Sequence, residues 1–463
     1  MLFHSPPFLV FFLAYFCVQL LIPRQHRLWL ILAGGTVFYA WWNCWLAWLP
    51  YSLAMIGWGG AVWISGTDEP IQRRRRLIIA LVLLLLPLAV FKYAHFLDTQ
   101  IVVPMLGLSF WPFELPLPLG ISFVTFTMIA YLVDYYRGNY PLERRLHMVA
   151  AYMVFFPHLI AGPILRPREI IPQLDHPRRA LDINAKLGIL LFTAGLAKKV
   201  IFGDAVAEVV DRSYTGGPGL TVLDHLFAIY GFALQIYCDF SGYTDMALGL
   251  ALLLGVRLPG NFKQPYLATS VSDFWRRWHI TLSHWLRDYL YIPLGGNRGG
   301  ALFRARNAMI TMVLGGLWHG ANWTFVLWGA LHGIFIALSG PRGRRSAPLT
   351  GWRKILAILV TLHVVILLWI PFRAPDIATA WRILQGLWTL PLGDPAAFVT
   401  THAYVLLLLG LFVLWHPFDR YARLRWAARH MQPALLWPAI MLVWIIAISV
   451  STGSSAKFIY FDF

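Results

Sequence analysis

A histidine in an apolar stretch is the strongest candidate for chemistry in this sequence. His319 lies in GGLWHGANW, where small residues allow close approach of neighbouring backbone. Imidazole is the side chain best suited to move a proton near neutral pH. A buried histidine can also serve only to bond a backbone carbonyl between helices. The surrounding glycines favour the chemical role for His319.

A second histidine lies upstream beside two arginines. His279 follows Arg276 and Arg277 in WRRWH. An arginine pair can hold a phosphate-bearing donor while a nearby histidine faces the reacting centre. The alternative, which composition alone favours, is a basic face directed at lipid phosphates. His284-x3-Asp288 also matches a short acyltransferase-like pattern, but residues at this spacing on a helix face one another in any case.

Two aspartates interrupt a long apolar run, in QIYCDFSGYTDMALG. Asp239 and Asp245 could orient a histidine, line a polar cavity or pair with Arg276, Arg277 or Arg287. Structural pairing is favoured, and Asp239 also remains a candidate for donor binding. His158 has the same ambiguity, and His332 is expected to be structural.

Other catalytic motifs are missing from the sequence. It contains no G-x-S-x-G elbow, phosphate-binding G-x-x-x-x-G-K-[ST] loop, G-x-G-x-x-G fingerprint or H-E-x-x-H motif. The three cysteines have no zinc-site spacing. We therefore expect no metal and no bound cofactor.

The composition is that of a membrane protein. Apolar residues make up 59% and charged residues 13% of the 463 residues, and mean hydropathy is +0.62. Soluble domains have roughly 45–50% apolar and about 25% charged residues. A soluble enzyme, a disordered chain and a fibrous protein are therefore excluded. The net charge of +17 is attributed to cytoplasmic loops rather than to nucleic-acid binding.

The elements that must position the candidate residues are helices of uneven length. The N-terminal stretch MLFHSPPFLVFFLAYF is expected to be a retained span. A bilayer core needs roughly 20 helical residues, and several apolar runs are shorter. The layout therefore predicts full spans, half-spans and surface helices. The later runs are Leu28–Trp42, Trp45–Ser65, Leu77–Phe91, Leu117–Val133, Val149–Gly162, Leu187–Phe202, Leu223–Leu254, Ala308–Leu338, Ile355–Ile370, Ala403–Trp415 and Leu435–Val450.

Three of these stretches have distinctive flanks. Val149–Gly162 lies between basic stretches, which predicts a re-entrant segment at a cavity wall. Ala308–Leu338 lies between arginines that include Arg342, Arg344 and Arg345, which predicts a helix pair with WHGAN at its tip. Val271–Tyr291 has aromatic residues at helical spacing, which predicts one amphipathic helix at the membrane surface.

These stretches together resemble the membrane-bound O-acyltransferase (MBOAT) family, and most closely its bacterial branch involved in alginate O-acetylation. The resemblance covers nearly the whole chain, and its two longest blocks are highly specific. The matching motifs are FYAWW, FKYAHF, LPLGISFVTF, FFPHLIAGPILRPRE, YCDFSGYTDMALGLALLLG, NFKQPY, DFWRRWHITLSHWLRDYLYIPLGGNRGG, GGLWHGANWTFVLWGALHG and the closing KFIYFDF.

The resemblance implies an all-α, polytopic fold in which tilted helices and re-entrant segments surround a central tunnel. It also implies a single membrane domain over residues 1–463, with the densest motifs in 237–333. The family's invariant histidine falls on His319, and a second histidine of the bacterial branch falls on His279. Asn322 is a candidate donor of a hydrogen bond, although eukaryotic relatives place their catalytic asparagine upstream of the histidine.

The activity implied is transfer of an acetyl group from a cytoplasmic thioester, acetyl-CoA, to an exopolysaccharide such as alginate. Arg276, Arg277 and Lys263 would then bind the coenzyme A phosphates. The expected partners are the lipid bilayer, periplasmic acetyltransferase proteins and the polysaccharide, and the expected location is the bacterial inner membrane. Three alternatives remain open: another acceptor (cellulose or peptidoglycan), D-alanyl transfer to teichoic acid, and a transporter.

Overall fold

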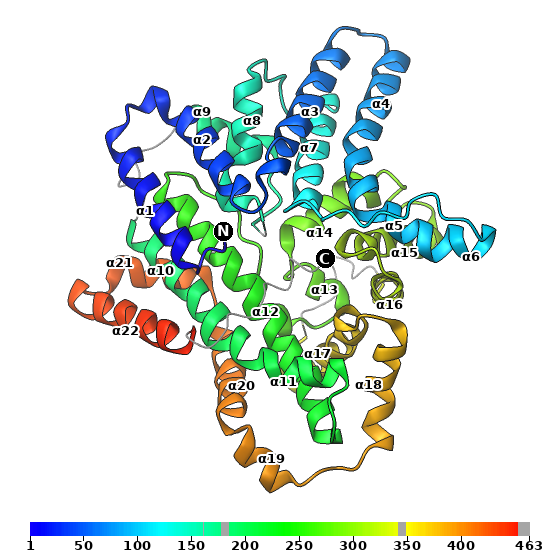
Figure 1. Cartoon of the computed structure of the whole chain (residues 1–463), viewed down its shortest axis with the longest axis vertical. Coiled ribbons are helices and arrows are strands. Elements are labelled where there is room, and N and C mark those ends of the chain that lie inside the picture. The colour runs from blue at the N-terminus through cyan, green and yellow to red at the C-terminus, as the bar shows by residue number, and fades with distance from the viewer. Residues whose placement is uncertain (161, 177–184, 341–348, 452–463) are drawn as a thin grey trace. The chain divides into compact units, whose positions relative to one another are not determined.

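A computed structural model describes residues 1–160, 162–176, 185–340 and 349–451 (Figure 1). Within these ranges all regular structure is helical, with α, 3-10 and π segments and no strand. The all-α prediction is therefore confirmed. The KFIYFDF motif, Arg342, Arg344, Arg345 and the end of the basic stretch 166–179 lie outside the described residues.

The chain forms two compact units, and each is described by itself. The first comprises Met1–Phe192 with Met246–Pro259, and the second comprises Thr193–Asp245 with Gly260–Phe463. The single domain and the ring of helices around a tunnel stay predictions.

The first unit is organised around α7, whose residues from Ile121 to Asp134 are all buried. This helix packs against α3 and α4. Helix α2 packs against α8 so closely that a Cβ atom on Gly35 would lie 2.1 Å from the Val154 carbonyl oxygen. The helices that lie wholly in this unit are α1 (Pro6–Leu21), α2 (Arg27–Ala40), α3 (Leu49–Ser65), α4 (Pro70–Leu88), α5 (Ala94–Leu97), α6 (Val103–Leu106), α7 (Ile121–Tyr136), α8 (Leu146–Val154) and α9 (Pro167–Asp175).

The expected re-entrant segment begins as a short helix and continues as irregular backbone. Helix α8 ends at Val154, and a 3-10 turn, Phe156–His158, precedes residues 159–160 and 162–166, which are non-helical. The Tyr152 hydroxyl donates to the Leu165 carbonyl at 2.7 Å, and His158 Nε2 lies 2.9 Å from the Tyr152 carbonyl oxygen. His158 therefore holds this buried loop together. The cavity wall stays a prediction.

The second unit contains both candidate histidines. Its helix α12 accounts for the long apolar run as one unbroken helix of 32 residues, which continues into the first unit, as does α10. Helix α10 (Ala185–Leu196) begins in the first unit and ends in the second, and α12 (Val222–Leu253) begins in the second and ends in the first. The helices that lie wholly in the second unit are α11 (Asp204–Thr215), α13 (Val271–Trp275), α14 (Ile280–Leu286), α15 (Gly300–His319), α16 (Trp323–Leu338), α17 (Gly351–Arg373), α18 (Ile377–Thr389), α19 (Pro395–Thr401), α20 (Ala403–Trp415), α21 (Tyr421–His430) and α22 (Pro433–Ser451).

The predicted helix pair is confirmed. Helices α15 and α16 pack side by side (Figure 1), joined by residues 320–322. A Cβ atom on Gly316 would lie 2.1 Å from the Phe325 carbonyl oxygen, and one on Gly329 would lie 2.3 Å from that of Met312. Glycine at both positions allows this contact, and WHGAN lies at the tip as expected.

The single amphipathic helix predicted over Val271–Tyr291 is wrong. The chain forms α13, breaks at residues 276–279, forms α14 and ends in the π-helical segment Arg287–Tyr291. His279 adopts a left-handed conformation (φ 43°, ψ 55°), which interrupts the helix. The aromatic side chains Phe274 and Trp278 are buried within the unit. They form a core rather than a surface face.

Several helices are suited to cross a membrane by length and composition. Among the described residues these are Pro70–Leu106, Gly351–Arg373 and Pro433–Ser451. A fourth possible span, Pro395–Thr401 with Ala403–Phe418, is bent by 82°. Other apolar helices, such as α7, have only 16 residues. The predicted uneven helix lengths are confirmed, and the division into full spans, half-spans and surface helices stays a prediction.

Candidate active site

His319 is enclosed by aromatic rings from three helices. It is the last residue of α15 and only 4% exposed. Its ring centroid lies 5.0 Å from that of Trp318, 5.2 Å from that of Trp328 on α16 and 5.2 Å from that of Phe372 on α17. This surrounding excludes bulk water and holds the imidazole orientation.

His279 lies at the break between α13 and α14. Its side chain is fully buried. Its ring centroid lies 4.6 Å from that of Phe240 on α12, in a T-shaped arrangement. Its Nδ1 atom lies 3.3 Å from Oδ1 of Asn261. Asn261 belongs to NFKQPY, so this motif supplies a polar contact to a catalytic candidate.

One indole ring connects the two histidines. Trp318 has its ring centroid 6.1 Å from that of His279 and 5.0 Å from that of His319. Residues far apart in the sequence thus meet around Trp318 inside one unit. The catalytic roles of the two histidines stay predictions, but the structure does place them in one neighbourhood.

Asn322 caps the second helix of the pair. Its Oδ1 accepts from the Thr324 N–H at 3.0 Å, and its Nδ2 donates to the Pro375 carbonyl oxygen at 2.7 Å. The amide therefore fixes the start of α16 and ties it to the chain after α17. A contact with substrate stays a prediction for this residue.

The basic candidates lie on two stretches of main chain that a hydrogen bond joins. Lys263 and Arg276 are exposed, and the Lys263 N–H donates to the Arg277 carbonyl oxygen at 2.9 Å. Asp273 accepts from Arg276 at 3.2 Å and from Arg277 at 3.1 Å. The main chain of residue 263 thus adjoins that of residue 277, and one carboxylate holds both arginines. Binding of a phosphate-bearing donor by these three cations stays a prediction.

Asp273 holds Arg276 and Arg277 through its negatively charged carboxylate. Burial acts to raise the pKa of its carboxyl, but the Thr269 N–H and the Arg277 and Arg276 guanidinium groups outweigh burial and lower the pKa. The carboxylate is therefore charged near neutral pH and can hold both arginines.

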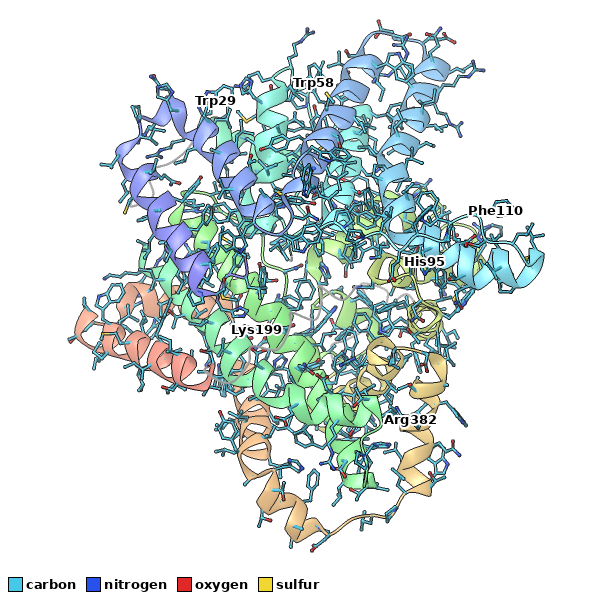
Figure 2. All side chains as sticks on the ribbon, in the orientation of Figure 1. Trp29, Trp58, His95, Phe110, Lys199 and Arg382 are labelled. Atoms are coloured by element: carbon cyan, nitrogen blue, oxygen red, sulfur yellow. The ribbon has the colours of Figure 1, made fainter. Side chains whose placement is uncertain are left out.

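Asp239 forms the structural ion pair that was favoured, but with a different partner. It lies 2.5 Å from Lys199, a residue labelled in Figure 2, and not beside the arginines that we expected. Lys199 also contacts Asp204 at 2.7 Å. Asp245 pairs with the neighbouring Lys198 at 2.6 Å. Asp239 and Asp245 of α12 are thereby joined to one segment.

Lys198 and Lys199 were not singled out from the sequence. They lie in the π-helical segment Ala197–Gly203, and both are buried. Lys198 also reaches Asp419 at 2.7 Å. Their position could have identified them, because two adjacent lysines interrupt the apolar run Leu187–Phe202 and buried lysines need anionic partners.

Two weaker candidates have simple structural partners. Asp288 pairs with its neighbour Arg287 at 2.6 Å. His332 accepts a hydrogen bond at Nδ1 from the Trp275 indole at 3.1 Å, as expected of a structural residue.

Comparison with known proteins identifies the family. The model of the membrane-bound O-acyltransferase family matches residues 145–370, which include both histidines. The probable alginate O-acetylase AlgI of Azotobacter vinelandii is 40% identical over 402 residues, covering 84% of this chain and 79% of the relative. The chain belongs to the membrane-bound O-acyltransferase family. It is a polytopic membrane protein and an O-acyltransferase.

Other members of the MBOAT family have different named activities. The peptidoglycan O-acetyltransferase of Helicobacter pylori is 37% identical over 424 residues, covering 84% of this chain and 80% of the relative. The teichoic acid D-alanyltransferase of Bacillus subtilis is 27% identical over 289 residues, covering 57% of this chain and 73% of the relative. The resemblance seen in the motifs is confirmed at the level of the family.

Proposed function

We propose that this MBOAT protein transfers an acetyl group from cytoplasmic acetyl-CoA toward hydroxyl groups of an alginate-like exopolysaccharide. It would act in the bacterial inner membrane together with periplasmic acetyltransferase proteins. The observation that carries the proposal is the meeting of buried His319 and His279 around Trp318. The 40% identity to an alginate O-acetylase supports acetyl as the group transferred.

His319 is the proposed general base. It takes the proton from the attacking hydroxyl as the oxygen forms a bond to the thioester carbonyl carbon. The tetrahedral intermediate then collapses, the carbon–sulfur bond breaks, and the departing sulfur receives the proton from the imidazolium. General acid–base catalysis of this kind contributes about 10²–10⁴ in rate. The aromatic enclosure of His319 strengthens its electrostatic interactions by excluding water.

The other residues serve binding and orientation in this proposal. Arg276, Arg277 and Lys263 bind the coenzyme A phosphates in this proposal, since they are cations on adjoining stretches of main chain, and Asp273 holds the two arginines. His279 orients the substrate or donates a hydrogen bond to the oxyanion. Asn322 remains a candidate donor at the tip, and Asp239 supports the site through its pair with Lys199.

A peptidoglycan acceptor is the second candidate, favoured by the 37% identity to the Helicobacter pylori enzyme. Mass spectrometry of each polymer from a deletion strain separates the two. Loss of acetyl esters from exopolysaccharide alone supports the first proposal, and loss from peptidoglycan alone supports the second.

The enzymatic test measures release of free coenzyme A from acetyl-CoA by membranes that contain the protein, with and without a periplasmic extract. His319→Ala is expected to abolish release. His430→Ala is the matched control, because this exposed histidine lies on α21 and bonds only locally to the Trp426 carbonyl in the described contacts. Wild-type rates in His319→Ala would refute the assignment.

A further inference from the structure

We propose that Asn261 is a positioning residue that fixes His279 as the tautomer with its proton on Nδ1. The lone pair of the neutral ring then lies on Nε2. This inference rests on the proposed function, since Asn261 supports His279, a residue of the same candidate site.

The orientation of the Asn261 amide follows from an unambiguous donor. The Thr281 backbone N–H donates to Oδ1 at 3.1 Å, so this atom must be the oxygen. The Thr281 hydroxyl also donates to Oδ1, at 3.0 Å. Asn261 is only 1% exposed, which protects these bonds from competition with water.

The amide orientation determines the histidine tautomer. His279 Nδ1 lies 3.3 Å from the same Oδ1 atom. A carbonyl oxygen can only accept, so the imidazole nitrogen must carry the proton that it donates. In a neutral imidazole the other nitrogen then carries the lone pair. Asn261 thus determines which ring nitrogen of His279 carries the proton.

The backbone of the same segment holds His279 in place. The Ile280 N–H donates to the Asn261 carbonyl oxygen at 2.9 Å, and the Lys263 N–H donates to the Arg277 carbonyl oxygen at 2.9 Å. These bonds bracket His279, whose φ of 43° is uncommon for a residue other than glycine. Such a conformation persists where the surroundings over-determine it. The side chain and main chain of residues 261–263 supply that support.

Asn261→Ala and Asn261→Asp test the role. Alanine removes the acceptor, and kcat for coenzyme A release is expected to fall about 10–100-fold, the loss typical when the partner that orients a metal-binding histidine is removed. The KM for acetyl-CoA should stay nearly unchanged. Aspartate keeps an acceptor for Thr281 and His279, and should restore most of the lost kcat.

Asn307→Ala is the matched control. Asn307 is also fully buried and holds a loop, since its Nδ2 donates to the Gly296 carbonyl at 3.0 Å, but its described bonds include no histidine. We expect lower thermal stability with nearly unchanged kcat. Equal losses of kcat in Asn307→Ala and Asn261→Ala, or a wild-type kcat in folded Asn261→Ala, would overturn the positioning role.

Nitrogen-15 NMR of histidine-labelled protein gives a readout that does not depend on activity. The His279 signals, assigned by their loss in His279→Gln, should show a proton on Nδ1 in the wild type and in Asn261→Asp. A proton on Nε2 in the wild type would refute the inference. Wild-type protein that shows this tautomer but releases no coenzyme A, with or without the extract, would instead refute the proposed function alone.

Discussion

Replacing Gly316 with alanine tests how the helix pair supports His319. The added Cβ atom would lie 2.1 Å from the Phe325 carbonyl oxygen, and that oxygen belongs to a helix backbone that cannot rotate away. Contacts below 3.0 Å are essentially never made by a real Cβ atom. The facing segments of α15 and α16 must therefore separate by about 1 Å, and overpacking of this kind costs about 1–3 kcal/mol of folding free energy.

The displacement reaches the candidate active site directly. Gly316 lies one helical turn before His319, and Trp328 of the opposite helix contacts the His319 ring. A misplacement of about 1 Å at reacting groups can lower the rate about 100-fold. We therefore expect Gly316→Ala to fold with reduced stability and to release coenzyme A about 100-fold more slowly.

The assay compares kcat for coenzyme A release with the thermal midpoint of detergent-purified protein. Gly410→Ala is the matched control, because a Cβ atom added to this helical glycine would have nothing within 4 Å and alanine favours a helix by about 1 kcal/mol. A wild-type kcat in Gly316→Ala, under conditions where His319→Ala is inactive, would refute the coupling between close helix packing and catalysis.

Three further predictions use the same assays. Lys199→Met leaves the buried Asp239 carboxylate without this cation and should cost about 3–5 kcal/mol of folding free energy, seen as a lower thermal midpoint. Adding Asp239→Leu should recover part of that loss. An unchanged midpoint in Lys199→Met alone would contradict the ion-pair role. Arg276→Gln combined with Arg277→Gln should raise the KM for acetyl-CoA about tenfold at constant kcat, since charged hydrogen bonds to phosphate are lost; an unchanged KM would exclude them from donor binding. Asn322→Ala should cost about 1 kcal/mol by loss of the cap, seen as a lower thermal midpoint. Asn322→Asp keeps the cap but loses the bond that the amide donates to the Pro375 carbonyl, and a wild-type kcat in this variant would exclude the amide as a donor to substrate.

The sequence by itself determined the class of the protein and the residues around its main histidine. Composition required a membrane protein, because no soluble core could bury so much apolar surface. Basic flanks were enough to predict the helix pair with His319 at its tip. These features are local, so they could be recognised without the tertiary structure.

The tertiary structure decided which cation pairs with Asp239 and which with Asp245. Asp239 pairs with Lys199 across helices, whereas sequence reasoning had offered arginines. Side-chain pairing at long sequence separation depends on which helices pack together, and periodicity carries no information about that packing.

The break at His279 was also decided by tertiary contacts. Aromatic spacing predicted a continuous helix through this residue. Bonds from Asn261 hold the backbone in a left-handed conformation instead, while Phe240 and Trp318 enclose the ring. The sequence thus named the chemical groups, and packing between distant segments determined their orientation, because burial and hydrogen bonding outweigh the weak preference of a short helix.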